Sequence, residues 1–184
     1  MELSDWELVR KCQAGEMSSF QELASRYHQK VYMVILGLLR NRDDALDVAQ
    51  ETFFRAYRKI NSFQGGSSFY TWIYRIAVNL AIDAQRRQKR NPLDLRESMD
   101  TLLEAQDETA RDPFADVHDK ELRENLVKAI NDLTPEHKAV IVLRTIDGLS
   151  YKDIGEILGC SEGTVMSRLH YARKKLQEKL SAFL

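Results

Sequence analysis

Residues 63–90 (FQGGSSFYTWIYRIAVNLAIDAQRRQKR) constrain the fold of this 184-residue chain more than any other segment. A Gly/Ser loop leads into a run whose apolar residues recur at helical spacing, which predicts an amphipathic helix with one buried stripe. The stripe consists of Phe69, Trp72, Ile73, Ile76, Ala77 and Leu80. Tyr70 and Tyr74 fall outside the stripe, so we expect them to lie off the hydrophobic core.

The other flank of this helix is polar and basic. Arg75, Asn79 and Arg86 follow one line at i, i+4 and i+11, and Arg87 belongs to the closing run RRQKR. Aromatic rings beside a basic track can stack unpaired bases and neutralise their phosphates, which is typical of single-strand binding. The alternative is structural: all the rings are core, and the basic run favours the helix C-terminus.

The rest of the chain also has helical periodicity, without the alternation typical of strands. Charged residues are plentiful and only 8 Gly and 3 Pro occur, which favours an all-α protein. Ser4 and Gly15 bracket the first expected helix, and Thr134-Pro135 precedes a later one. We expect helices over about residues 5–14, 18–39, 43–60 and 68–90, and then over 119–132, 135–147, 151–158 and 162–180.

Charge and proline placement predict two small helical domains, residues 1–92 and 119–184, joined by a flexible acidic linker. Asn91-Pro92 should end the fourth helix, because proline biases the preceding residue away from helix. Residues 93–118 carry 2 Lys or Arg against 8 Asp or Glu, whereas residues 1–92 carry 14 against 10. The formal net charge of −1 therefore hides a basic first half and an acidic linker.

The last two expected helices form a helix-turn-helix pattern, in which Gly159 ends a short helix and Ser161 caps a longer one. The buried positions are Tyr151, Ile154 and Leu158, then Val165, Leu169, Ala172 and Leu176. The opposite side of the second helix offers groups suited to base edges and phosphates in a major groove. These outer-face residues are Thr164, Met166, Ser167, Arg168, His170, Tyr171, Arg173 and Lys174. An ordinary αα-hairpin with a solvated outer face is the alternative.

Residues 43–60 carry two stripes. The expected core stripe consists of Leu46, Ala49, Phe53, Ala56, Tyr57 and Ile60. The second stripe consists of Asp47, Glu51, Phe54 and Arg58. An exposed phenylalanine ringed by charge suggests a docking surface for a partner protein, although single exposed aromatics are common.

Several classes of function are not indicated. Cys12 and Cys160 lie far apart without a C-x-x-C partner, which indicates neither a disulfide framework nor a zinc site. The histidines lack ligand spacing, and the sequence contains no catalytic constellation, so we expect no metal, no cofactor and no enzymatic activity. No apolar run is long enough to span a membrane, and residues 1–10 lack a signal-peptide core. We therefore expect a cytoplasmic protein.

Taken together, these segments resemble a bacterial extracytoplasmic-function (ECF) sigma factor, the smallest class of RNA polymerase specificity subunit, over nearly the whole chain. DDALDVAQETFFRAY is similar to the family's segment that binds core polymerase. INSFQGGSSFYTWIYRIAVNLAID resembles the segments that melt the promoter and read its upstream element. LTPEHKAVIVLRTIDGLSYKDIGEILGCSEGTVMSRLHYARKKL resembles the family's helix-turn-helix domain.

The resemblance implies that the chain binds core RNA polymerase, directs it to −10 and −35 promoter elements and helps open the duplex. The polymerase would contact Asp47, Gln50, Glu51 and Phe54. A base flipped from the −10 element would enter a pocket formed by the loop of residues 61–68. The residues that contact −10 DNA would be Asn61, Phe63, Ser67, Tyr70, Trp72, Tyr74, Arg75, Asn79, Arg86 and Arg87. The eight outer-face residues of 162–180 would meet the −35 element. The linker would pass toward the polymerase active site, and an anti-sigma factor, commonly membrane-bound, would restrain the chain.

Two residues of the last helix depart from the family pattern. Met166 and Tyr171 stand where basic residues are common, so no particular −35 sequence can be transferred from the family to this chain. Met166 could contact a thymine methyl group.

Two other functions remain as alternatives. One is a conventional dimeric helix-turn-helix regulator that binds an operator, and the other is an adaptor that binds polymerase without promoter DNA. The aromatic and basic segment argues against the regulator, because an operator binder need not hold single strands.

Overall fold

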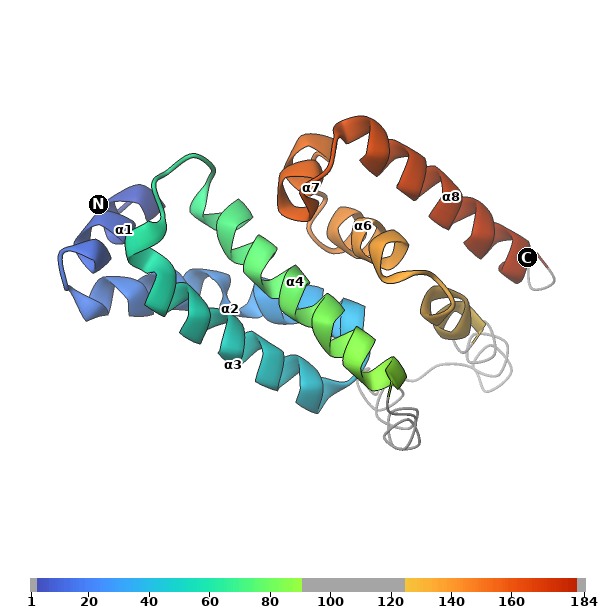
Figure 1. Ribbon diagram of the computed structural model, residues 1–184, viewed down its shortest axis with the longest axis horizontal. Coiled ribbons are helices and arrows are strands. Elements are labelled where there is room, and N and C mark those ends of the chain that lie inside the picture. Colours follow the sequence, from blue (N-terminus) through green and yellow to red (C-terminus); the bar gives the residue numbers. More distant parts are fainter. Residues whose placement is uncertain (1–2, 91–124, 182–184) are drawn as a thin grey trace, which may run out of the picture.

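The computed structural model describes residues 3–90 and 125–181, and these form an all-helical protein without strands in that part of the chain (Figure 1). The first half contains α1 (Asp5–Gln13), α2 (Met17–Leu39), α3 (Arg42–Lys59), the short 3-10 helix η1 (Ile60–Ser62) and α4 (Phe69–Arg90). The second half contains α6 (Pro135–Ile146), α7 (Tyr151–Leu158) and α8 (Glu162–Leu180), preceded by helical residues 125–131. The all-α prediction is confirmed, and the expected linker 93–118 lies outside the described residues.

Capping side chains set most helix starts. Ser4 and Glu7 form a reciprocal capping box at α1, and the Asn41 side chain accepts backbone N–H bonds at the start of α3. Thr134, Ser150 and Ser161 accept backbone N–H bonds in the same way at α6, α7 and α8. Seven of the eight predicted helices begin and end within a residue or two of the observed ones, and the start of the predicted helix 119–132 lies outside the described residues.

The first half is a bundle in which α2, α3 and α4 pack against one another and α1 packs on α2 (Figure 1). Val31 and Ile35 of α2 and Ile73 of α4 are fully buried in it. In the second half, α6 and α7 both pack on α8 through Ile154, Val165 and Leu169, as the helix-turn-helix pattern predicts. None of the described helices is long and apolar enough to cross a membrane.

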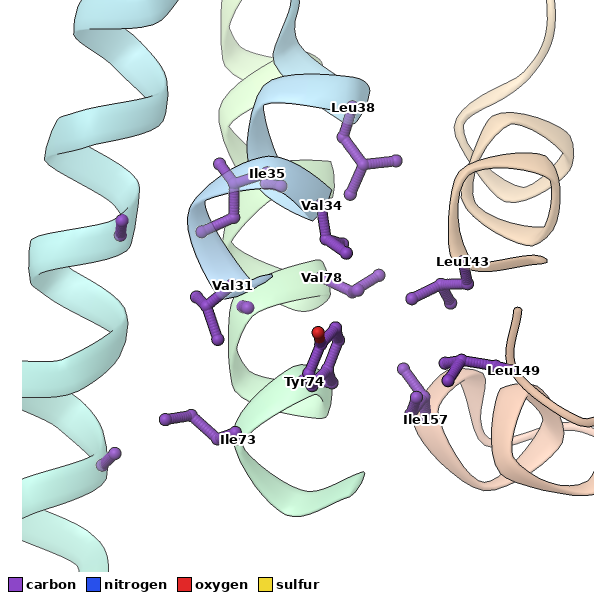
Figure 2. Close-up of a cluster of buried hydrophobic side chains, with 14 of the residues drawn as sticks. Val31, Val34, Ile35, Leu38, Ile73, Tyr74, Val78, Leu143, Leu149 and Ile157 are labelled. Atoms are coloured by element: carbon purple, nitrogen blue, oxygen red, sulfur yellow. The ribbon is translucent and has the colours of Figure 1, made fainter. Parts of the chain in front are cut away.

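The two halves share one hydrophobic core, because α4 packs on α7 and α2 packs on α6. Figure 2 shows Tyr74 and Val78 of α4 facing Leu143, Leu149 and Ile157 of the second half. Gly37 permits this approach, since a Cβ there would lie only 2.9 Å from Ile146 Cδ1 and 3.0 Å from Val142 Cγ1.

Two sequence expectations about the core are wrong. Tyr74 is fully buried, together with Val78 and Ala81, because α4 has a second buried face that meets the second half of the chain. On α3, Leu46 and Tyr57 are 43% and 40% exposed. The small side chains of Ala45, Ala49, Thr52 and Ala56 line the buried face of α3 instead, which allows its neighbours to approach closely.

Candidate nucleic-acid interface

A hollow of about 500 Å³ lies beside the loop between η1 and α4, where the resemblance to sigma factors implies capture of a flipped base. Its lining is Ser62, Phe63, Gln64, Gly66, Ser67, Trp72, Arg75 and Glu156, and we call it the first hollow. Four predicted −10 residues therefore come together there: Phe63, Ser67, Trp72 and Arg75. Asn61, the other predicted −10 residue of the loop 61–68, is exposed in η1 and does not line the hollow.

Aromatic packing fixes the wall of the first hollow. Phe63 is buried, and its ring centroid lies 5.2 Å from that of Trp72 and 6.1 Å from that of Phe69. Trp72 is half-buried, so part of its ring remains accessible. Phe63 thus acts as a support for the wall, whereas Trp72 offers a surface on which a base can stack.

The polar line of α4 is exposed, but part of it contacts the second half of the chain. Arg75 donates from Nε and Nη2 to the backbone oxygen of Glu156, at 3.1 and 2.7 Å. Arg86 forms an ion pair with Glu136, with 3.3 Å between Nη2 and Oε1. Asn79 and Arg87 are exposed on the same helix. Two of the predicted DNA-binding cations are therefore engaged by α6 and α7 in this arrangement.

Tyr70 and Tyr74 occupy the junction of the two halves. Their ring centroids lie 4.7 Å apart, and the Tyr74 hydroxyl donates a hydrogen bond to the Asp147 carboxylate. Burial and the nearby Asp147 charge raise the pKa of both phenols, so both stay neutral hydrogen-bond donors. Within residues 3–90 and 125–181, the buried Tyr70 hydroxyl has no hydrogen-bond partner. Tyr74 is thus closed off from DNA while the halves are packed together.

The outer face of α8 is open, as the helix-turn-helix pattern predicts. Met166 and Tyr171 are 55% and 53% exposed, and Ser167, His170, Arg173 and Lys174 are exposed with them. Thr164 and Arg168 are half-buried, the latter with Nη1 3.7 Å from Cys160 Sγ. The Tyr171 ring lies 4.7 Å from that of His137, whose pKa is lowered by burial and by the Arg168 charge. The eight predicted −35 residues thus share one helix, six of them exposed.

The turn before α8 depends on a glycine in the preceding helix. A Cβ at Gly155 would lie only 2.7 Å from the backbone oxygen of Cys160. Gly159 then ends α7 with a φ of 65°, a left-handed conformation that favours glycine. These two positions bring α7 and α8 close enough to form the motif.

The predicted polymerase-binding residues lie along α3. Phe54 is 55% exposed, with the Arg58 guanidinium 5.6 Å from its ring centroid. Glu51 forms an ion pair with Arg55, with 2.6 Å between Oε1 and Nε. Asp47 and Gln50 are exposed on the same helix. The sequence missed two further apolar residues of α3, Leu46 and Tyr57, because their helical spacing resembled a core stripe.

A second hollow, of about 300 Å³, lies where α1 meets the same loop. It is lined by Asp5, Trp6, Phe63, Gly65, Ser67, Ser68 and Phe69. Trp6 was missed by the sequence analysis, although a tryptophan in the first turn of a short capped helix was a detectable signal. Among the described residues, no group of three or more His, Cys, Asp or Glu side chains could hold a metal ion.

Known proteins resemble this chain in sequence. The family models described as Sigma-70 region 2 and Sigma-70, region 4 match residues 23–91 and 123–176. The ECF RNA polymerase sigma-E factor of Haemophilus influenzae is 38% identical over 189 residues, which cover 100% of this chain and 98% of that protein. The sigma-E factor of Escherichia coli K12 is 35% identical over 187 residues, covering 100% and 97%.

Solved structures share the fold. CnrH in complex with the cytosolic domain of CnrY superposes with a TM-score of 0.69 at 24% identity, covering 97% of each chain. The sigma factor RpoE of Bartonella quintana, solved in complex with the anti-sigma factor NepR, gives a TM-score of 0.65 at 26% identity. That match covers 88% of this chain and 96% of RpoE.

Proposed function

This chain belongs to the extracytoplasmic-function sigma factors, and we propose that it uses the surfaces described above to bring core RNA polymerase to a promoter and open it. A sigma factor is a transcription initiation factor, and this one acts by binding, without covalent chemistry. The observation that carries the residue-level proposal is that one chain contains both an aromatic-lined hollow and the exposed outer face of a helix-turn-helix. The first hollow suits an unpaired base, and the outer face of α8 suits a duplex.

The first hollow receives the base flipped from the −10 element. Flipping costs a few kcal/mol, and stacking on an aromatic ring returns roughly 1–3 kcal/mol per base. Trp72 provides the ring, and Ser67 provides a hydroxyl at the rim of the hollow. Arg75, Asn79, Arg86 and Arg87 then follow the strand backbone along α4, where their charges attract phosphates.

The outer face of α8 enters the major groove at the −35 element. Arg168, Arg173 and Lys174 supply phosphate or base contacts, and Thr164 and Ser167 supply hydroxyls near the N-terminus of the helix. Met166 and Tyr171 place two large exposed side chains among them. Apolar contact with thymine methyl groups is the readout that suits the Met166 side chain.

Core polymerase docks on the exposed face of α3. Phe54 stands out of that face beside Arg58, and Asp47, Gln50 and Glu51 surround it with polar groups. An exposed aromatic anchor with a polar rim is the usual anatomy of a protein interface. Leu46 and Tyr57 extend the apolar part of this surface along the same helix.

Binding both promoter elements requires the two halves to separate. The −35 and −10 elements lie about 25 base pairs apart, or about 85 Å at 3.4 Å per base pair. The 19 residues of α8 span only about 28 Å, and α7 and α8 pack directly beside α4. Separation also frees Tyr74, Arg75 and Arg86 from Asp147, Glu156 and Glu136.

An anti-sigma factor restrains the chain in the cytoplasm. The support for this partner is the structural similarity to RpoE of Bartonella quintana, which was solved in complex with the anti-sigma factor NepR. Anti-sigma factors of this family are commonly membrane-bound, and we propose such a partner here.

Co-purification with core polymerase, followed by run-off transcription from genomic fragments, tests the proposed function. A sigma factor should bind core polymerase and yield transcripts that start at defined sites only when the chain is present. A conventional dimeric regulator should fail to co-purify with core polymerase. An adaptor should co-purify but give no defined start sites.

A further inference from the structure

Helix α1 contacts the loop of residues 61–68 at two places. Gln13 donates hydrogen bonds from Nε2 to the backbone oxygens of Ile60 and Phe63, both at 2.9 Å, so α1 holds the beginning of the loop. Trp6 lies over Gly65 in the middle of the loop. A Cβ at Gly65 would be only 2.7 Å from Trp6 Cζ3 and 2.9 Å from Cη2. The indole therefore rests on the Gly65 backbone, where a side chain would collide with the ring unless Trp6 moved.

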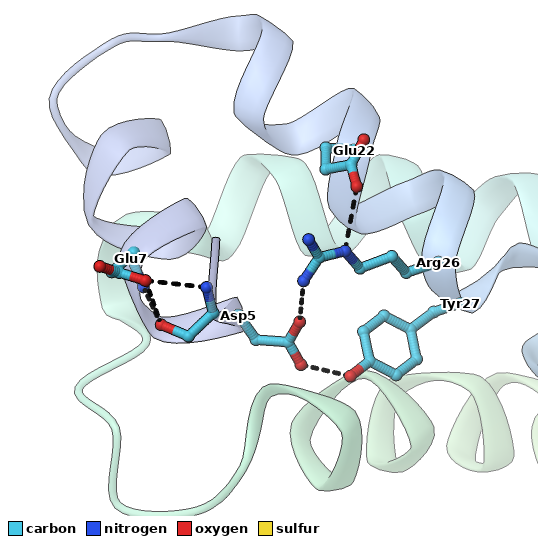
Figure 3. A network of polar contacts seen from close by, with 6 residues as sticks. Asp5, Glu7, Glu22, Arg26 and Tyr27 are labelled. Atoms are coloured by element: carbon cyan, nitrogen blue, oxygen red, sulfur yellow. Dashed lines mark hydrogen bonds and ion pairs between the residues drawn. The ribbon is translucent and has the colours of Figure 1, made fainter. Parts of the chain in front are cut away.

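The position of Trp6 is itself fixed by the neighbouring residue. Figure 3 shows the Asp5 carboxylate reaching Arg26 and Tyr27 of α2. Asp5 Oδ1 lies 3.0 Å from Arg26 Nη1, and Oδ2 accepts a hydrogen bond from the Tyr27 hydroxyl. The Tyr27 ring in turn packs 5.6 Å from that of Phe69, the first residue of α4. The start of α1 is thus tied to the helices that frame the loop.

Trp6 is too exposed to be explained by core packing. It remains 45% exposed while its ring meets that of Phe63 edge-on at 6.1 Å. Phe63 lines both hollows, and so does Ser67, which means that the second hollow adjoins the first across the loop. Moving Trp6 would therefore move the wall of the first hollow.

We propose that Trp6 is a positioning residue for promoter melting: it holds Gly65 and Phe63 so that the loop keeps the shape that receives the flipped base. This inference rests on the proposed function, since it assigns a role to a residue behind the same hollow. Gln13 has the same role at the other contact point. Because neither residue lines the first hollow, both act on the base through the loop.

The test uses holoenzyme reconstituted from core polymerase and the full chain, on a promoter recovered by run-off transcription. The variants are Trp6→Ala, Trp6→Phe and Gln13→Ala, with Met33→Ala as the control for loss of an exposed apolar side chain on α2. Core-polymerase affinity, melting temperature, and opening of a duplex and of a template mismatched across the −10 region are compared. Failure of the unaltered chain to open any promoter would refute the proposed function, not the role of Trp6.

We expect Trp6→Ala to slow opening of the duplex by about 10- to 100-fold, the range that misplacement of a binding group by about 1 Å can cause. Polymerase affinity should stay unchanged, the mismatched template should restore most of the activity, and Trp6→Phe should lie near the unaltered protein. Gln13→Ala should slow opening in the same way, and Met33→Ala should not. Unchanged opening in Trp6→Ala, or an equal loss on both templates together with weaker polymerase binding, would overturn the proposal.

A double variant tests the contact itself. Gly65→Ala places a methyl group against the indole and should impair opening strongly, partly through its φ of +75°. Removing the indole as well removes the collision, so Trp6→Ala/Gly65→Ala should be less impaired than the product of the two single losses. Losses that simply multiply would show that Trp6 and Gly65 act independently, and the proposal would fail.

Discussion

Asp147→Ala should favour separation of the two halves of this protein. We call the arrangement with the halves packed together closed, and the arrangement with the halves apart open. In the closed arrangement the Asp147 carboxylate accepts a hydrogen bond from Tyr74, whose side chain is fully buried between the halves. Removing the carboxylate leaves the phenol buried without this partner, which costs about 1–3 kcal/mol. Water can hydrate the phenol once the halves separate, so the cost falls on the closed state alone.

The expected change in the equilibrium is about 5- to 150-fold toward the open state, which is the factor equivalent to that energy. If the closed state predominates, the apparent affinity for a promoter carrying both elements rises by up to the same factor, since more of the protein is competent to bind. Asp147→Asn is the matched control, because its amide oxygen can still accept the bond, and it should shift the equilibrium less.

Fluorescence energy transfer between dyes at Lys30→Cys on α2 and Glu178→Cys on α8 measures the separation, with Cys12 and Cys160 replaced by serine. Both labelled positions are exposed, so the dyes should not disturb packing. Asp147→Ala should add a population with lower transfer, and circular dichroism should show that its helices remain intact. An unchanged transfer distribution in the folded variant would refute the claim that this hydrogen bond holds the halves together.

Three further experiments, with four substitutions, test other parts of the protein. Phe54→Ala should weaken binding to core polymerase by about 2 kcal/mol or more, because a central aromatic anchor is lost; a folded variant with unchanged affinity in a competition assay would remove α3 from the interface. Arg168→Ala and Arg173→Ala should each flatten the dependence of log affinity on log salt by about 0.9 for a −35 duplex, and an unchanged slope for both would exclude phosphate contacts. Gly155→Ala should lower stability by roughly 1–3 kcal/mol, because its methyl group would meet the Cys160 oxygen at 2.7 Å; an unaltered melting temperature would contradict that geometry.

Local signals made the helices predictable from the sequence. Ser4, Thr134, Ser150 and Ser161 cap their helices with hydrogen bonds to backbone groups a few residues away, so the relevant physics lies within one turn. The buried stripe of α8 and the exposure of its outer face follow from helical periodicity in the same way. A hollow does lie at the loop where base capture was expected, because its lining comes mainly from one loop and the helix after it, and its role in base capture stays a prediction.

Contacts between distant segments were beyond the sequence analysis. Tyr74 was expected off the core because periodicity identifies one buried face of a helix, whereas α4 has a second face that packs on α7. Leu46 and Tyr57 were expected in the core because large apolar residues usually are, but α3 is approached along its alanines. Trp6 was missed because its contact is Gly65, which folding brings to α1 from far along the chain.

Permanganate footprinting of a duplex promoter by the reconstituted holoenzyme tests the central claim most directly, because permanganate oxidises unpaired thymines. Thymines in a short segment around the −10 element should become reactive only when this chain is present with core polymerase. They should become reactive much more slowly when the first hollow is altered by Trp72→Ala on a folded chain. A holoenzyme that binds the promoter but leaves these thymines unreactive would contradict the account.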